Sequence, residues 1–154
     1  MILEQTGQLA PANNPVQLIR DAIGDLELQE KEPQVLIDMG AWHEPDYNRP
    51  DRCYQCLAGA SMSRRLGLSL EEQWIPDELP EKIRNKIQAL NFFRMGQVRL
   101  AFKTLGLIGE EEPIVLPAEL EWRAIPCYGD SPEGFKKEML KLADDIEAFL
   151  NQNN

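Results

Sequence analysis

The most constraining feature of this sequence is an amphipathic pattern in its last 25 or so residues. Ser131-Pro132-Glu133 combines a capping residue, a first-turn proline and an acid near the positive end of a helix dipole. Large apolar residues then recur at helical spacing, at Phe135, Met139, Leu142, Ile146 and Phe149. The sequence therefore predicts a long helix that buries one face against the rest of the chain.

Two further segments have helical periodicity. Asn14-Pro15 predicts the start of a helix that ends before Pro33. From Pro80 onward, two apolar faces that do not register with each other meet at residues 91–96. We therefore expect a kinked helix there, or two helices at an abrupt corner.

Strand signals are fewer and shorter. Val35-Leu36-Ile37 is a branched apolar run that predicts a buried strand, and part of residues 113–128 is expected to pair with it. Residues 40–50 carry two prolines and are expected to form a loop. The expected fold is α+β, a mostly helical single domain over residues 1–154 with a small two- or three-stranded sheet. Residues 1–13 are expected to form a flexible arm.

Charge and composition restrict the partners and the compartment. The chain carries a formal net charge of -10, although residues 49–103 are basic by four charges. A net negative field repels nucleic acid and acidic membranes, and no apolar run reaches the roughly 20 residues that span a bilayer. The N-terminus lacks a secretory pattern, and three cysteines do not predict a disulfide framework. We expect a cytoplasmic protein with no membrane partner and no nucleic-acid partner.

Residues 39–68 concentrate the residue types that carry chemistry. They contain His43, which is the only histidine, together with Cys53 and Cys56. A helix rich in small residues is expected to begin at about Cys53 and to approach another backbone closely. Both thiols would then lie at a helix N-terminus, where the dipole lowers the pKa of a thiol.

Three kinds of chemistry fit this stretch. His43, Cys53, Cys56 and Cys127 together form a ligand set that suits tetrahedral zinc, although the spacing is permissive rather than diagnostic. The zinc deaminase signature is excluded, because no acid stands two positions after His43 and no proline precedes Cys53. Alternatively, a cysteine acts as nucleophile with His43 as base. Dithiol redox chemistry is the third option, but the flanking βαβ pattern is absent.

A structural interpretation of the same residues is favoured over all three. Cysteine is among the most buried residue types and packs as a small apolar side chain. The chain also lacks a glycine-rich phosphate loop, a paired-histidine helix motif and a Gly-x-Ser-x-Gly elbow. We therefore expect a non-catalytic intracellular binding or regulatory protein that acts through protein contacts and needs no cofactor. The alternative is a zinc-binding or cysteine-dependent enzyme centred on His43, Cys53 and Cys56.

The motifs between Val35 and Leu105 also carry a resemblance. Trp42-His43 with Cys53-x-x-Cys56-Leu-Ala-Gly-Ala, followed by Ala89-Leu90-Asn91 and Arg94-x-Gly96, resembles a group of small phage and bacterial proteins of unknown function. The resemblance implies an intracellular, phage-related protein. It transfers no activity and no catalytic residue.

Overall fold

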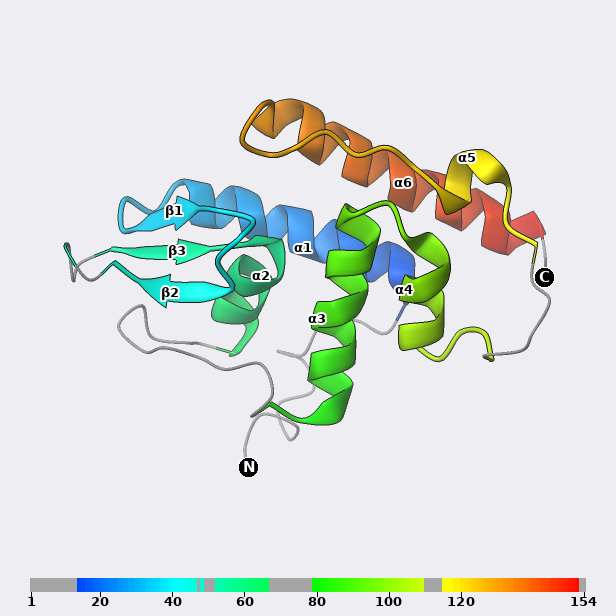
Figure 1. The fold of residues 1–154 in the computed structure, drawn as a ribbon, viewed down its shortest axis with the longest axis horizontal. Helices are drawn as coiled ribbons and strands as arrows, with labels where there is room; N and C mark the ends of the chain where they lie inside the picture. The colour runs from blue at the N-terminus through cyan, green and yellow to red at the C-terminus, as the bar shows by residue number, and fades with distance from the viewer. Residues whose placement is uncertain (1–13, 47, 49–51, 67–78, 110–114, 153–154) are drawn as a thin grey trace. The chain divides into compact units, whose positions relative to one another are not determined.

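The computed structural model describes residues 14–46, 48, 52–66, 79–109 and 115–152 (Figure 1). Within this part of the chain, helices predominate and the strands are short. Their order is α1 (Pro15–Glu30), β1 (Val35–Ile37), β2 (His43–Pro45), β3 (Cys53–Gln55), α2 (Leu57–Leu66), α3 (Glu81–Arg94), α4 (Val98–Thr104), α5 (Ala118–Glu121) and α6 (Pro132–Gln152). The expected α+β class, mostly helical with a small sheet, is confirmed.

The described residues pack into two compact units. The described residues between 21 and 84 belong to the first unit, and those between 14 and 20 and between 85 and 152 belong to the second. Helices α1 and α3 each contribute residues to both units. The expectation of one domain over residues 1–154 stays a prediction, and the expected arm at residues 1–13 lies outside the described residues. None of the described helices combines the length and apolarity that crossing a membrane requires.

The sheet of the first unit has the strand order β1-β3-β2. β3 pairs in parallel with β1, opposing Val35 to Cys53, and antiparallel with β2, opposing Pro45 to Cys53. The backbone amide of Cys53 also donates to the carbonyl of Gln34 at 2.8 Å, and the amide of Asp38 donates to the carbonyl of Gln55 at 2.9 Å. The backbone groups of β3 are thus paired on both sides.

Helix α2 packs against this sheet through small residues. A Cβ atom at Gly59 would lie 1.7 Å from the carbonyl oxygen of Trp42 and 3.6 Å from the Cβ of Gln55. The predicted close backbone approach is therefore confirmed. Only hydrogen fits at this position of the helix.

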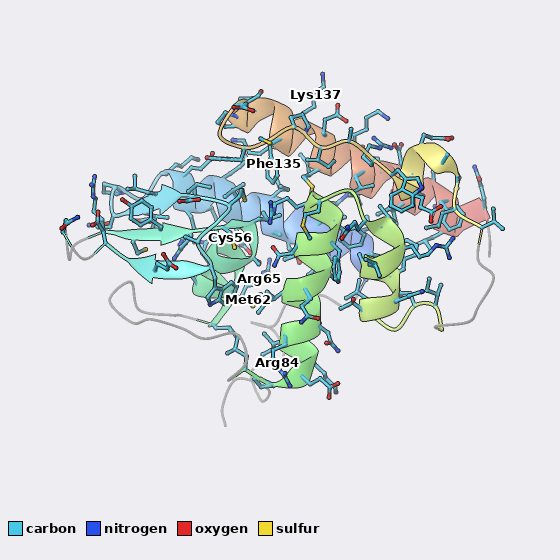
Figure 2. The ribbon with its side chains drawn as sticks, in the orientation of Figure 1. Cys56, Met62, Arg65, Arg84, Phe135 and Lys137 are labelled. Carbon is cyan, nitrogen blue, oxygen red and sulfur yellow. The ribbon has the colours of Figure 1, made fainter. Side chains whose placement is uncertain are left out.

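The second unit is built around α6. Ser131 accepts a hydrogen bond from the amide of Gly134 at 3.1 Å, so it caps the helix as expected. The predicted apolar face is buried, from Phe135 through Met139, Leu142 and Ile146 to Phe149 (Phe135 is labelled in Figure 2). The corner expected at residues 91–96 is also confirmed, because α3 ends at Arg94 and α4 begins at Val98.

Three local predictions were wrong. The stretch that was expected to be a loop contains β2, an edge strand in which Pro45 is tolerated because an edge needs fewer amide donors. The helix starts at Leu57 rather than at about Cys53, because pairing on both sides holds residues 53–55 in a strand. Residues 115–128 form no strand, and α5 occupies part of them. Residues 113 and 114, which belong to the stretch that was expected to supply a strand, lie outside the described residues.

Candidate functional site

The sheet brings the two parts of the His–Cys motif side by side along the backbone. Pro45 is opposite Cys53 and His43 is opposite Gln55 in the antiparallel register. Cys56 follows β3 directly and stands at the start of α2 (Figure 2), where its sulfur accepts a hydrogen bond from the amide of Gly59 at 3.4 Å. Only one of the two motif thiols therefore lies at a helix N-terminus.

The environment of Cys53 is that of a packed side chain. Cys53 is fully buried and Cys56 is 4% exposed. Burial raises the pKa of the Cys53 thiol, so the expected lowering of its pKa is wrong. A buried thiol with a raised pKa is protonated at neutral pH and reacts slowly.

Cys127, by contrast, is an exposed free thiol. Among the described residues, no group of three or more His, Cys, Asp or Glu side chains is placed to hold a metal ion. For His43, the structure describes the position of the backbone in β2. The zinc site of His43, Cys53, Cys56 and Cys127 stays a prediction. The catalytic roles of His43, Cys53 and Cys56 also stay predictions.

A polar network in the first unit joins α2 to the part of α1 within that unit. Asp25 accepts hydrogen bonds from the Ser61 hydroxyl at 3.0 Å and from the Arg65 Nε at 2.8 Å. Gln29 donates to the side-chain oxygen of Gln55 at 2.9 Å. Burial raises the pKa of Asp25, and the charge of Arg65 offsets part of that effect. Asp25 and Ser61 are both largely inaccessible, so this network holds helices together rather than meeting a ligand.

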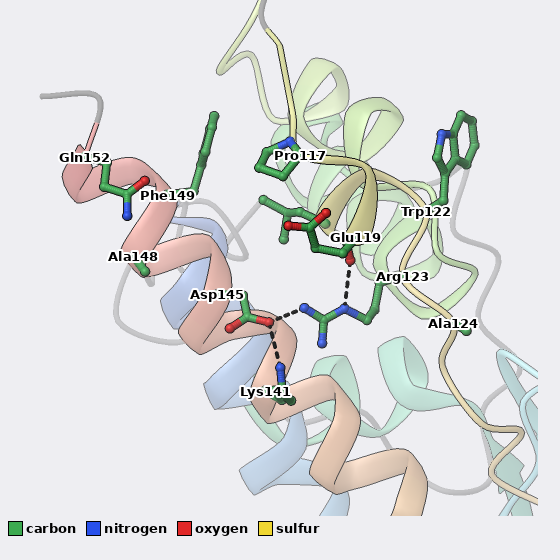
Figure 3. Close-up of a pocket in the computed structure, with 11 residues that line it drawn as sticks. Pro117, Glu119, Trp122, Arg123, Ala124, Lys141, Asp145, Ala148, Phe149 and Gln152 are labelled. Carbon is green, nitrogen blue, oxygen red and sulfur yellow. Dashed lines mark hydrogen bonds and ion pairs between the residues drawn. The ribbon is translucent and has the colours of Figure 1, made fainter.

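The second unit contains an open pocket of about 700 Å³ (Figure 3). It lies between residues 117–124, which include α5, and residues 141–152 of α6. The lining combines apolar and charged side chains: Pro117, Glu119, Leu120, Trp122, Arg123, Ala124, Lys141, Asp145, Ala148, Phe149 and Gln152. Its volume falls within the range of small-molecule and side-chain pockets.

Arg123 fixes one wall of this pocket to α6. Figure 3 shows its guanidinium pairing with the carboxylate of Asp145, while its Nε donates to the backbone oxygen of Glu119 at 3.1 Å. Lys141 donates to the same carboxylate of Asp145 at 3.1 Å. The hydrogen bond from Arg123 holds the pKa of Asp145 below its usual range. Arg123 is only 12% exposed, so the pair is shielded on one side.

The opposite side of the same wall is fixed by the α3–α4 corner. Gly96 adopts φ +75°, and a Cβ there would lie 2.3 Å from the carbonyl oxygen of Arg123. Arg99 donates through Nε to Glu121 at 2.9 Å. The segment that carries α5 is therefore held from two directions, and the pocket is formed before any ligand arrives.

Sequence reasoning missed this pocket. Trp122 is 69% exposed at its margin, and it lies within residues 113–128, part of which was expected to form a strand. One local signal was present, because Trp122-Arg123 stands in a segment bounded by Pro117 and Pro126 without a periodic apolar pattern. The partner of Arg123, Asp145, lies on a separate helix and leaves no local trace.

The resemblance to small phage and bacterial proteins stays a prediction. No protein-family model, no curated protein and no solved structure matched this chain.

Proposed function

We propose that this chain is a non-catalytic intracellular binding protein that acts through protein contacts, with the α5–α6 pocket as its contact site. The observation that supports it is the 69% exposure of Trp122 beside a preformed pocket. The few residues that supply most of the binding energy of protein interfaces are enriched in tryptophan, tyrosine and arginine, and preformed sites lose little entropy on binding. The free thiols of all three cysteines agree with a reducing, cytoplasmic compartment.

A capture experiment with matched variants tests this proposal. Wild-type protein, Trp122→Ala and Met95→Ala are immobilised and exposed to lysate of the cells from which the protein comes. Met95 is 52% exposed in the same unit and does not line the pocket, so it controls for loss of an exposed apolar side chain. We expect a partner that wild type and Met95→Ala retain equally and that Trp122→Ala loses about tenfold or more.

Equal capture by all three proteins contradicts the proposal. So does turnover of ester, amide or nucleotide substrates by the wild type that disappears in Cys53→Ala or Cys56→Ala. Either result moves the function away from the pocket.

A zinc-binding or cysteine-dependent enzyme is the second candidate. The register that places β2 beside β3 favours it, since it brings the backbone of His43 to the strand of Cys53. Elemental analysis of protein purified without chelator tests the zinc-binding form of this candidate. Stoichiometric zinc that is lost in His43→Ala supports the metal site, and protein without zinc removes that branch.

A further inference from the structure

We infer that the α5–α6 pocket recognises a basic segment with an apolar anchor on a partner protein. A lysine or arginine of that segment lies beside Glu119 and Trp122, and a large apolar side chain packs against Leu120 and Phe149. The inference rests on the proposed function and adds the chemistry of the partner.

One carboxylate of the pocket lining, that of Glu119, has no charged partner among the described residues. Both cations of the lining have acidic partners, since Arg123 and Lys141 share Asp145. Arg123 also lies 3.8 Å from the carboxylate of Glu138. For the exposed carboxylate of Glu119, no ion pair occurs within the described part of the chain. The formal charges of the four ionised lining side chains sum to zero, so the preference for a cation is local to the unpaired Glu119, and the net charge of -10 on the whole chain adds to it.

The end of α6 adds to this negative potential. Ala148, Phe149 and Gln152 line the pocket in the closing turns of a 21-residue helix, and the last turn of that helix carries no basic residue. The C-terminal carbonyl groups of a helix hold a partial negative charge that favours cations. An incoming ammonium or guanidinium supplies the positive group that the helix itself lacks.

The indole of Trp122 and the apolar lining select a segment with two kinds of side chain. An exposed indole face attracts a Lys or Arg side chain through cation–π interaction. Leu120 is 3% exposed and Phe149 is 8% exposed, so they form a packed apolar floor, and Trp122, which is 69% exposed, provides most of the exposed apolar surface of the lining. A small inorganic cation would leave this apolar surface uncovered. A segment with a basic and an apolar side chain covers both regions.

Selection from a random peptide display library tests the inference without assuming a partner. The full chain is the bait, and the enriched peptides are synthesised and titrated against wild type, Glu119→Gln and Glu133→Gln. Glu133 is an exposed acid on α6 whose side chain is 88% exposed and does not line the pocket, so it controls for the loss of one negative charge. Trp122→Ala is titrated in parallel.

We expect the enriched peptides to combine lysine or arginine with a large apolar residue. Their Kd rises about fivefold or more in Glu119→Gln and stays within about twofold in Glu133→Gln, because only Glu119 faces the bound cation. Affinity falls as salt is raised, since the contact is electrostatic and partly exposed. Trp122→Ala weakens binding further.

The contrary outcomes are distinct from one another. Enrichment of acidic or uncharged peptides that still need Trp122 overturns this inference and leaves the binding function standing. Equal effects of Glu119→Gln and Glu133→Gln overturn it in the same way. Peptides that bind independently of Trp122, or no enrichment at all, overturn the inference and the pocket-based function together.

Discussion

The α-carbon of Gly59 in α2 lies against the carbonyl oxygen of Trp42 so closely that a Cβ would stand 1.7 Å from that oxygen. Trp42 directly precedes β2, so this contact joins the helix to the edge of the sheet. Backbone cannot move aside as the end of a long side chain can. The contact therefore fixes how closely α2 approaches the β2 end of the sheet.

Gly59→Ala is expected to lower the free energy of unfolding by about 3 kcal/mol or more, because α2 must shift away from Trp42. Gly24→Ala is the matched control, since a Cβ there meets nothing within 4 Å on an exposed face of α1. The control is expected to gain about 0.5–1 kcal/mol from better helix propensity. Urea unfolding of both variants measures the difference. Similar effects in the two would show that the close approach does not exist.

The α3–α4 corner allows a second paired comparison. Gly96 and Gly106 both adopt φ +75°, but only Gly96 faces the carbonyl oxygen of Arg123. Alanine at either position costs about 1–2 kcal/mol for its backbone conformation. We expect Gly96→Ala to cost about 2 kcal/mol more than Gly106→Ala, because the wall of the pocket must also move. Equal losses in chemical denaturation would remove the corner as a support of the pocket.

The pair of Arg123 and Asp145 sets the stability of that wall. Arg123→Met leaves Asp145 with Lys141 alone and removes the bond to the Glu119 carbonyl. We expect a loss of about 2 kcal/mol in unfolding free energy, because Arg123 is only 12% exposed and makes charged hydrogen bonds. Arg20→Met, which breaks exposed pairs with Asp144 and Glu147, is expected to have a smaller effect. A reversed order of the two in thermal unfolding contradicts this account.

Asp25 gives the protein a specific pH dependence. An aspartate in the unfolded chain titrates near about 3.9, whereas burial raises the pKa of Asp25 in the fold. The folded state therefore holds the proton more tightly, and stability from this group falls as the pH rises from about 4 through the folded pKa. Compared with Asp25→Asn, the wild type should lose unfolding free energy over that interval. Urea midpoints measured every half unit from about pH 4 to about pH 7 check the sign, and a constant or growing advantage of the wild type contradicts it.

Thiol labelling separates the packed cysteines from the exposed one. Ellman's reagent is expected to react quickly with one equivalent, Cys127, and at least about 100-fold more slowly with Cys53 and Cys56, because access to these needs local opening. Cys127→Ser should remove the fast phase. A fast phase that survives in this variant would show a reactive thiol in the His–Cys motif and would favour the cysteine-dependent alternative.

Local signals explain the parts of the fold that the sequence predicts well. Asn14 does cap α1, accepting from the amide of Val16 at 2.8 Å, and Ser131 caps α6 in the same way. Each capping residue precedes its helix directly in the sequence, so capping residues and apolar periodicity suffice to predict these helices. The corner between α3 and α4 is predictable for the same reason.

The sheet and the pocket depend on contacts between distant segments. Nothing in Cys53-Tyr54-Gln55 itself distinguishes a strand from the first turn of a helix, and pairing with β1 and β2 decides between them. The role of Arg123 is likewise set by Asp145 on another element. The candidate site predicted from the sequence and the pocket found in the structure therefore differ. The predicted site follows from residue types that are close in the sequence, whereas the pocket is formed by packing between distant segments.

The strand order β1-β3-β2 has a consequence for the protein as it is made. β3 is synthesised last, yet it separates the two strands made before it, which do not pair with each other. After Pro45 leaves the ribosome, the nascent chain must extend to Gln55 before either strand finds its partner, an interval of about 1 s at ordinary translation rates. During that interval two short strands have unpaired edges that other chains can engage. Slow codons before Cys53 would lengthen this exposure and lower the yield of folded protein.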